Sequence, residues 1–467
     1  MPISPGFRDR LAQATGAERV RTKPADTWVY GYDNSRKHAP PDVVVYALSA
    51  REILDIVRVC YDSGVPLVAR GRGTATTGAA IPTRGGVVLS LERMNRILRN
   101  DPDNRLLIVE PGVTNQAVQE AAAQHGFFWA PDPTSAAYCS VGGNLAVNAA
   151  GPRAVKYGSC RENTLGLNAV TGAGDVIRTG THTTKGVVGY DLTRLLIGSE
   201  GTLAVITEAA LKLTPLPEAR RLLQAVFSDV AHAAAAISRL MAQPVTPCAL
   251  EFMDRQAIEM IRAYSTTPLP SDAGALLMIE VDGPAKLLDD LEAAIASAVR
   301  GPGLVEFRAA RSQTETDALW ATRKALSPAL RTVAPNKLNE DVVVPVSRLP
   351  ELIAGLEVLS QRYGIPIVNF GHAGNGNIHV NLLYNSQDPR QEANARPCLL
   401  EVFELVIRLD GTLSGEHGIG REKRDYLPLA IDPATLDLMR RIKTQFDPKG
   451  ILNPDKIFPP KASTNGK

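Results

Sequence analysis

Gly371-His-Ala-Gly-Asn-Gly-Asn-Ile-His-Val380 lies between two apolar runs of strand-forming residues. The Asn-Gly pair at its centre is the strongest short-range signal for a β-hairpin with a two-residue turn. A turn made by Asn375 and Gly376 would place His372 directly opposite His379, on one face of the ribbon. Because opposite residues of an antiparallel pair have Cβ atoms about 5 Å apart, both imidazoles could bind one ion. The stretch therefore predicts a metal-binding hairpin.

A metal site needs a further protein ligand, and a second glycine-rich run supplies candidates. Ser414-Gly-Glu-His-Gly-Ile-Gly-Arg421 offers either Glu416 or His417. The chain has 7 histidines, and three of them fall in these two runs. The alternative is that they are surface histidines near turns, but their concentration in two glycine-rich runs favours a metal site.

The composition limits the class of protein. At 467 residues the chain is longer than one typical domain, which predicts two domains. A formal net charge of +2, without a long run of like charge, argues against a nucleic-acid partner. The N-terminus lacks the apolar core of a signal peptide and no run of about 18 apolar residues occurs, so we expect a cytoplasmic protein. The 5 cysteines have no Cys-x-x-Cys spacing, which argues against an iron–sulfur cluster in this chain.

A short apolar strand, expected at residues 65–69, leads into Arg70-Gly-Arg-Gly-Thr-Ala-Thr-Thr-Gly78. Closely spaced glycines and hydroxyls after a strand let backbone N–H groups converge on phosphate oxygens, and Arg70 or Arg72 could supply positive charge. The dinucleotide fingerprint Gly-x-Gly-x-x-Gly fits only in part, because its third glycine falls on Thr76 and no helical pattern follows. We therefore expect a phosphate-binding loop outside a Rossmann fold. The alternative is a tight surface turn.

Local signals divide the rest of the chain. A helix is expected from an N-cap at Ser49 to a terminating Gly64. Small residues dominate positions 130–151, as where a backbone must approach a flat ligand, and a third glycine-rich turn occurs at residues 196–207. Beyond Pro215, helices rich in Ala and Leu alternate with strands, which predicts an α+β domain. The expected helices there are 231–241, 286–298 and 350–363, and the expected strands are 276–281, 341–345, 365–370 and 378–384.

Together these pieces resemble the FAD-linked oxidoreductases related to vanillyl-alcohol oxidase, in the branch of D-lactate, glycolate and D-2-hydroxyglutarate dehydrogenases. The resemblance spans residues 40–458, and its motifs occur in order at 70–78, 132–151, 189–207, 371–379, 414–421 and 446–454. It implies an α+β fold with a two-subdomain FAD-binding domain and an α+β substrate-capping domain. The expected ranges are 1–217 for the FAD-binding domain, 218–410 for the capping domain with the metal hairpin, and 411–467 for a C-terminal segment that returns to the FAD domain.

The resemblance implies that the first loop receives the FAD pyrophosphate, residues 131–148 run along the cofactor, and residues 200–206 hold its adenosine end. The implied cofactor-binding residues are Arg70, Gly71, Arg72, Gly73, Thr74, Gly78, Pro131, Asp132, Ser135, Gly142, Gly143, Asn144, Asn148, Glu200, Gly201, Ile206 and Asn453. Members that attach FAD covalently commonly use a histidine of the first loop or a cysteine of the second region. The first loop here has no histidine, so we expect noncovalent FAD, with Cys139 as the alternative point of attachment.

The resemblance also assigns roles to charged residues. The implied ligands of a divalent metal, zinc or manganese, are His372, His379 and Glu416. The implied catalytic residues are His417 as the base, and Arg323 and Lys337 as the cations that grip the substrate carboxylate. Two alternatives stay open. The two cations could be ordinary ion-pair partners of the nearby acids Glu340 and Asp341, and His417 could replace Glu416 as a metal ligand.

Oxidation of a 2-hydroxy acid removes a hydride from Cα and a proton from the hydroxyl. A metal chelated by that hydroxyl would lower its pKa, an imidazole could take the proton, and a planar guanidinium matches a carboxylate. We therefore expect metal-assisted, FAD-dependent oxidation of a small D-2-hydroxy acid, D-lactate or glycolate, to the 2-keto acid, with the hydride passing to flavin N5.

The missing cysteine clusters imply a separate electron acceptor. It could be an electron-transfer flavoprotein, a cytochrome or a quinone-linked iron–sulfur subunit, and such a partner could hold the protein at the inner membrane. The alternatives are a D-2-hydroxyglutarate dehydrogenase, an oxidase that passes electrons to O₂, a flavin subunit active only within an iron–sulfur complex, and a metal-binding module without flavin. The second carboxylate of hydroxyglutarate would need another cation, such as Arg255, Arg262 or Lys185. The protein could form a homodimer.

Overall fold

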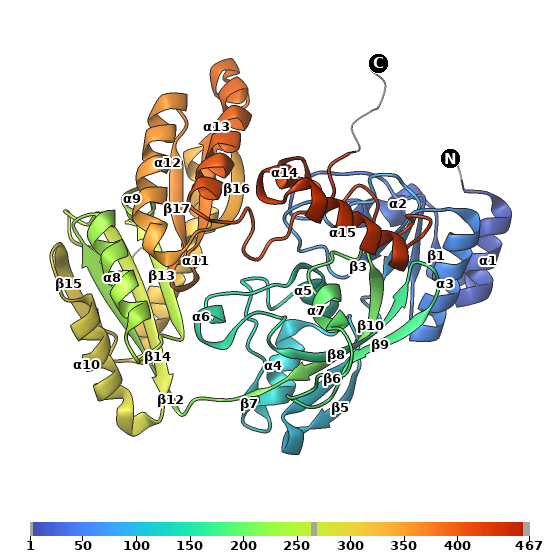
Figure 1. The fold of residues 1–467 in the computed structure, drawn as a ribbon, viewed down its shortest axis with the longest axis horizontal. Helices are drawn as coiled ribbons and strands as arrows, with labels where there is room; N and C mark the ends of the chain where they lie inside the picture. Colours follow the sequence, from blue (N-terminus) through green and yellow to red (C-terminus); the bar gives the residue numbers. More distant parts are fainter. Residues whose placement is uncertain (1–2, 263–268, 461–467) are drawn as a thin grey trace. The chain divides into compact units, whose positions relative to one another are not determined.

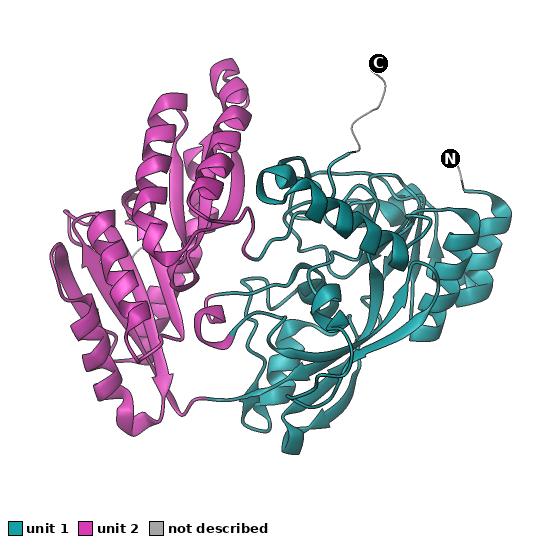
Figure 2. Cartoon of the chain, in the orientation of Figure 1, with its two compact units in different colours: residues 1–151, 158–216, 416–467 teal, residues 152–157, 217–415 magenta. Residues whose placement is uncertain are grey.

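The computed structural model describes residues 3–262 and 269–460. The chain forms two compact units (Figure 2). Unit 1 consists of Met1–Gly151, Gly158–Leu216 and Glu416–Lys467. Unit 2 consists of Pro152–Tyr157 and Pro217–Gly415. The short segment 152–157 therefore packs with unit 2, although the residues on both sides of it belong to unit 1.

The first sheet of unit 1 has four strands in the order β1-β2-β4-β3. Strands β2, β4 and β3 are parallel, β1 is antiparallel to β2, and β2 and β4 are buried along their whole length. Such strands read as continuous apolar runs because helices or loops cover both faces of a parallel sheet. Their bounds are Val20–Arg21 for β1, Val43–Tyr46 for β2, Leu67–Arg70 for β3 and Val87–Ser90 for β4.

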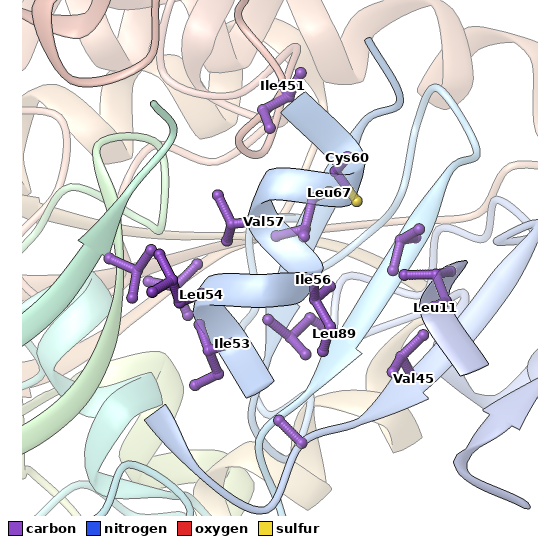
Figure 3. Close-up of a cluster of buried hydrophobic side chains, with 14 of the residues drawn as sticks. Leu11, Val45, Ile53, Leu54, Ile56, Val57, Cys60, Leu67, Leu89 and Ile451 are labelled. Carbon is purple, nitrogen blue, oxygen red and sulfur yellow. The ribbon is translucent and has the colours of Figure 1, made fainter. Parts of the chain in front are cut away.

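Helix α3 (Ala50–Ser63) packs on this sheet and confirms the helix expected from Ser49 to Gly64. The Ser49 side chain accepts a hydrogen bond from the Glu52 N–H, and Gly64 ends the helix with φ 62°. Its buried stripe meets residues of α1 (Pro5–Thr15) and of the C-terminal segment, including Ile451 (Figure 3). Each fully buried aliphatic side chain of this kind stabilises the fold by about 1.5–3 kcal/mol.

The second sheet of unit 1 is antiparallel, with the order β5-β6-β10-β8-β9, and β7 and β11 form a separate pair (Figure 1). The strands are β5 Ile97–Asp101, β6 Leu106–Val109, β7 Phe127–Phe128, β8 Thr164–Thr171, β9 Val176–Gly180, β10 Ala204–Lys212 and β11 Thr214–Pro215. The remaining helices of unit 1 are α2 Pro24–Thr27, α4 Asn115–Ala123, α5 Val141–Val147, α7 Leu192–Leu196, α14 Leu427–Ala430 and α15 Pro433–Phe446. Two residues of α15 pack on the core of this sheet, so the C-terminal segment belongs to both sheets of the unit.

Unit 2 is built on one antiparallel sheet of seven strands in the order β15-β12-β14-β13-β17-β18-β16. The strands are β12 Ala219–Phe227, β13 Ala249–Asp254, β14 Ala275–Gly283, β15 Leu304–Ala309, β16 Asn336–Val343, β17 Ile367–His372 and β18 Asn377–Tyr384. The helices are α6 Ala154–Tyr157, α8 Val230–Ala242, α9 Arg255–Ile261, α10 Leu288–Val299, α11 Gln313–Val333, α12 Leu349–Tyr363 and α13 Pro389–Arg408. Helices α9 and α11 share one core cluster with the sheet, and α8, α10, α12 and α13 lie on the other face (Figure 1). No helix of the described residues is long and apolar enough for a membrane crossing.

The hairpin β17–β18 differs from the expectation in its turn. His372 pairs with Asn377, and Phe370 pairs with His379, so the expected two-residue turn with His372 opposite His379 is wrong. The turn has four residues instead, because Ala373–Asn375 form a short 3₁₀ helix and Gly376 follows at φ 71°. His372 and His379 are diagonal neighbours, and the period of two along a strand keeps both on one face. Their ring centroids are 5.2 Å apart.

Candidate functional site

The first candidate loop of unit 1 begins at Arg70, the last residue of β3. Arg70 is 6% exposed, and its Nη2 donates to the carbonyl of Val29 at 3.3 Å. Its Nη1 has no hydrogen-bond partner among the described residues. Burial lowers the pKa of Arg70, while the charge of Asp33 opposes that shift. A buried, incompletely bonded cation at the end of a strand is the group expected beside a phosphate.

The loop lies against the small-residue segment that forms α5. A Cβ at Gly71 would lie 2.2 Å from Oγ of Ser140, the residue that caps α5, and a Cβ at Gly142 would lie 2.7 Å from Pro111. Only glycine allows backbones to approach so closely. The buried Nδ2 of Asn144 has no partner among the described residues. The structure thus brings the first two predicted cofactor segments together and leaves a buried donor there.

Glu200 holds a third segment against this region. Its carboxylate accepts hydrogen bonds from the N–H groups of Ile419 at 2.7 Å and Gly420 at 2.8 Å. Thr77 of the first loop adds a hydrogen bond from its Oγ1 to the carbonyl of His417 at 3.3 Å. The two glycine-rich segments therefore fix the loop that carries the candidate base, and both oxygens of Glu200 serve this purpose.

Asn453 ties the C-terminal segment to the same place. Its Nδ2 donates to the carbonyls of Glu200 at 2.7 Å and Ala79 at 2.9 Å, while its buried Oδ1 has no partner within the described residues. Buried polar atoms nearly always have a hydrogen-bond partner. Arg70 Nη1, Asn144 Nδ2 and Asn453 Oδ1 lack one among the described residues, which indicates a polar ligand. A dinucleotide such as FAD, with phosphates and amide groups, fits this donor and acceptor set.

Other predicted cofactor residues already have partners inside unit 1. The Oδ1 of Asn148 accepts from Ser159 at 2.9 Å and from the N–H of Arg161 at 3.0 Å. Ile206 lies in the core of the five-stranded sheet. Arg72 forms a long ion pair with Glu92 at 3.9 Å. The Pro131 carbonyl accepts from Asn115, the Ser135 carbonyl accepts from Tyr138 and Cys139, and Gly73, Gly78 and Gly201 have positive φ.

Cys139, the alternative point of covalent attachment, is 1% exposed. Burial raises the pKa of its thiol, which disfavours the thiolate that a covalent bond would require. Burial thus disfavours Cys139 as the point of attachment, and noncovalent FAD stays a prediction.

The hairpin of unit 2 supplies two candidate metal ligands. His372 and His379 are 7% and 9% exposed. One ligand atom from each, together with one carboxylate oxygen of Glu416, lie within 4.8 Å of one another. Two imidazoles and a carboxylate are the donor set expected for zinc or manganese with open coordination positions.

Glu251 on β13 is a buried partner of this site that the sequence analysis missed. It pairs in register with His372, and its Oε1 accepts from His372 Nδ1 at 2.5 Å. Its Oε2 accepts from Arg323 Nε at 2.8 Å and Nη2 at 2.7 Å. Burial alone would raise the pKa of Glu251, but its interactions with His372 and Arg323 outweigh burial and lower it. The sequence signal was an acid within a short, mostly apolar strand, which also carries the buried Asp254 at its end.

Arg323 lies on α11, and its side chain is 12% exposed. Its guanidinium stands 4.8 Å from the ring centre of Phe370. Its acid partner is thus the buried Glu251 and not Glu340 or Asp341, while a role of Arg323 in binding a substrate carboxylate stays a prediction. Lys337 lies on β16 in register with Leu383, and the described contacts do not decide its role.

Asp341 is a second buried acid beside the hairpin. It pairs in register with His379 across β16 and β18. Its carboxylate accepts from Ser414 Oγ at 3.1 Å and from the Gly415 N–H at 2.9 Å. Asp341 therefore fixes the residues that directly precede Glu416.

Comparison with known proteins gives two family matches. Residues 41–180 match a family described as FAD binding domain, and residues 216–457 match FAD linked oxidases, C-terminal domain. Glycolate oxidase subunit GlcD of Bacillus subtilis (strain 168) is 37% identical, over 98% of this chain and 97% of that protein. D-lactate dehydrogenase of Archaeoglobus fulgidus is 36% identical, over 89% and 91%. D-2-hydroxyglutarate dehydrogenase of Stutzerimonas stutzeri (strain A1501) is 30% identical, over 97% and 99%.

The fold also matches solved structures. p-Cresol methylhydroxylase with substrate bound superposes with a TM-score of 0.78, over 97% of each chain, at 16% sequence identity. That likeness concerns the fold alone, and it confirms the expected fold class of a two-part FAD-binding protein with mixed helices and sheets.

Proposed function

We propose, from the premise that the chain belongs to the family of FAD-linked oxidases, that it is a metal-assisted dehydrogenase of a small D-2-hydroxy acid. Family membership confirms the resemblance carried by the six motifs, and with it an FAD-dependent oxidoreductase. The finer proposal is that D-lactate or glycolate is oxidised to the 2-keto acid. The relatives named glycolate oxidase subunit, D-lactate dehydrogenase and D-2-hydroxyglutarate dehydrogenase support this substrate class.

One observation carries the proposal. A single buried carboxylate, Glu251, bonds both Arg323 and His372. A cation suited to a substrate carboxylate and a histidine suited to a metal are thus fixed in one network. An α-hydroxy acid is the kind of molecule that offers a carboxylate and a hydroxyl on adjacent carbons to such a pair.

The chemistry divides among named residues. FAD, when bound, supplies the hydride acceptor, and a divalent ion at His372, His379 and Glu416 would supply a Lewis acid. The guanidinium of Arg323 binds the substrate carboxylate, aided by Lys337. His417 takes the proton of the substrate hydroxyl oxygen, since an unperturbed imidazole has a pKa of about 6.5.

A small monocarboxylic substrate is consistent with the hydrogen bonds that two of the three candidate cations for a second carboxylate, Arg255 and Arg262, already make. Arg262 donates to the carbonyls of Leu269 and Pro270, both at 2.8 Å. Arg255 donates to the carbonyl of Ser228 at 3.3 Å. Both have backbone partners, so a second substrate carboxylate would have to displace existing bonds.

We propose that the electrons leave through a separate acceptor. The 5 cysteines are free and buried, and the relative GlcD is named a subunit. An electron-transfer flavoprotein, a cytochrome or a quinone-linked iron–sulfur subunit would fit, with the chain itself in the cytoplasm. Reduction of an artificial acceptor by the purified protein, without peroxide formation, would distinguish a dehydrogenase from an oxidase.

Two variants test the assignment of roles. His417→Asn should retain FAD and metal but slow flavin reduction by about 10²–10⁴-fold, the usual contribution of a general base. His372→Ala should lose metal and turnover while keeping FAD. His125→Asn, which alters a histidine outside both candidate sites, is the control. Unchanged flavin reduction in His417→Asn would remove this residue as the base, and full turnover in His372→Ala would remove the metal from the proposal.

A further inference from the structure

We propose that Glu251 is a positioning residue that couples the metal ligand His372 to the carboxylate-binding Arg323 through its two oxygens. The inference rests on the proposed function and deepens it. We infer that Glu251 fixes the tautomer of His372 and the orientation of Arg323. Metal affinity should therefore depend on Glu251, although this acid is not itself a metal ligand.

Backbone register explains why Glu251 is the residue in this place. Glu251 faces His372 directly across the β13–β17 pair, and both side chains point to the sheet face that α11 covers. Opposite residues of neighbouring strands have Cβ atoms about 4.5–5.5 Å apart, which suits a bond between a carboxylate and an imidazole. Glu251 is 1% exposed, so water does not compete for its oxygens.

The bond to His372 determines which ring nitrogen is available. An ionised carboxylate only accepts hydrogen bonds, so Nδ1 of His372 must carry the proton. The neutral ring then presents Nε2 with its free lone pair, which is the form that binds a metal. Histidine ligands are commonly fixed by a carboxylate in this way, and loss of such a partner typically lowers metal affinity 10–100-fold.

The bond to Arg323 determines which edge of the guanidinium is available. Glu251 Oε2 accepts from Nε and Nη2 of Arg323, so the Nη1 end of this guanidinium remains for another acceptor. Phe370 packs under the same guanidinium and limits its rotation. A substrate carboxylate would therefore meet Arg323 at one end and in one plane.

The positive charge of Arg323 also weakens the effect of Glu251 on His372. It partly neutralises Glu251, so the carboxylate is less able to increase the basicity of His372 than a free carboxylate would be. The bond from Glu251 to His372 should strengthen metal binding, whereas the bond from Glu251 to Arg323 should weaken it. A residue that only supports the fold would not show these opposite effects, so they identify a positioning role.

The test is calorimetric titration of Zn²⁺ and Mn²⁺ into metal-free holoprotein with FAD bound. Glu251→Gln offers one acceptor oxygen and a donor amide in place of two acceptors, so it cannot serve His372 and Arg323 together. We expect its metal affinity to fall 10–100-fold. Arg323→Met should bind metal at least as tightly as the wild type, because Glu251 keeps its charge. Asp254→Asn, which alters another buried acid of the same strand, should leave the affinity unchanged.

A second readout is independent of turnover and of metal. Nitrogen NMR of ¹⁵N-histidine protein should show His372 as the Nδ1–H tautomer, and this signal should change in Glu251→Gln but not in Asp254→Asn. Equal metal affinity of Glu251→Gln and the wild type would overturn the inference. So would equal losses in Glu251→Gln and Asp254→Asn. A wild type that binds no metal would instead defeat the metal in the proposed function.

Discussion

At the scale of single residues, buried carboxylates organise both candidate sites. Glu200, Glu251 and Asp341 are at most 4% exposed. A buried carboxylate is costly unless its oxygens are bonded, and these bonds go to groups of the functional segments. Glu200 holds the loop of His417, Glu251 holds His372 and Arg323, and Asp341 holds the residue before Glu416. The positions of the candidate functional residues are thus fixed by acids that take no part in the proposed reaction.

Glu200 gives a prediction about pH. Burial raises its pKa from 4.5 to about 7, against the N–H groups of Ile419 and Gly420, which lower it. Between these two values the folded protein holds a proton that the unfolded chain has lost, so this group makes the free energy of unfolding fall as pH rises. The full effect is on the order of 3 kcal/mol.

Glu200→Gln cannot ionise and should show a shallower loss of stability with pH. The check is the thermal unfolding midpoint of the apoprotein from pH 5 to 7.5. Glu208→Gln, on β10 of the same unit, is the control. Identical slopes for Glu200→Gln and the wild type would contradict the assigned ionisation.

At the scale of elements, the turn of the β17–β18 hairpin places the two histidines. Gly376 closes it at φ 71°, and its N–H donates to the Ala373 carbonyl at 2.9 Å. A Cβ at Gly376 would lie 1.9 Å from the carbonyl oxygen of Val344. Neither the backbone angle nor the space allows a side chain, so the position of His372 relative to His379 depends on this glycine.

Gly376→Ala should therefore lower the thermal unfolding midpoint and weaken metal binding, because it combines left-handed strain with a steric clash. The matched control is Gly364→Ala at the end of α12, with φ 64° and no heavy atom within 4 Å of the added Cβ. The control should cost only about 1–2 kcal/mol, the strain of the left-handed conformation alone. The thermal unfolding midpoint and the metal affinity should be measured for both variants. Equal losses in Gly376→Ala and Gly364→Ala would mean that the hairpin turn is not constrained as described.

Elements with local signals were predictable, and contacts between distant strands were not. The cap at Ser49 and the terminating Gly64 predicted α3 because both signals lie within the helix itself. The Asn-Gly pair gave the correct hairpin but the wrong turn, since the short 3₁₀ helix before Gly376 has no comparable local signal. Glu251 was missed because it lies 121 residues from His372, and only the pairing of β13 with β17 joins them.

At the scale of the whole molecule, a short strap of unit 2, residues 152–157, interrupts the sequence of unit 1. Lys156 and Tyr157 of the strap both donate to the carboxylate of Asp282 on β14, the tyrosine at 2.7 Å. Glycines with positive φ stand at both ends, Gly151 at 137° and Gly158 at 78°. The strap is thus anchored by its last two residues, and a glycine with positive φ lies directly outside each of its ends.

Asp282→Asn should loosen the strap, because it removes the charge that holds Lys156. Breaking a buried pair costs about 3–5 kcal/mol, and partial exposure of the lysine reduces this figure to roughly half. Trypsin should then cleave after Arg153 or Lys156 faster than in the wild type, as followed by mass spectrometry. Asp289→Asn, at a fully exposed partner of Arg221, is the control. No change in cleavage would show that the anchor does not hold the strap.

The central claim is metal-assisted oxidation of a small D-2-hydroxy acid, and anaerobic stopped-flow reduction of the bound flavin tests it most directly. The protein is mixed with D-lactate, L-lactate, glycolate and D-2-hydroxyglutarate, before and after chelation. We predict rapid loss of the yellow flavin absorbance with D-lactate or glycolate, abolished by the chelator and restored by zinc or manganese. Flavin reduction that is indifferent to chelation, or a yellow protein that none of these acids reduces, would contradict the account.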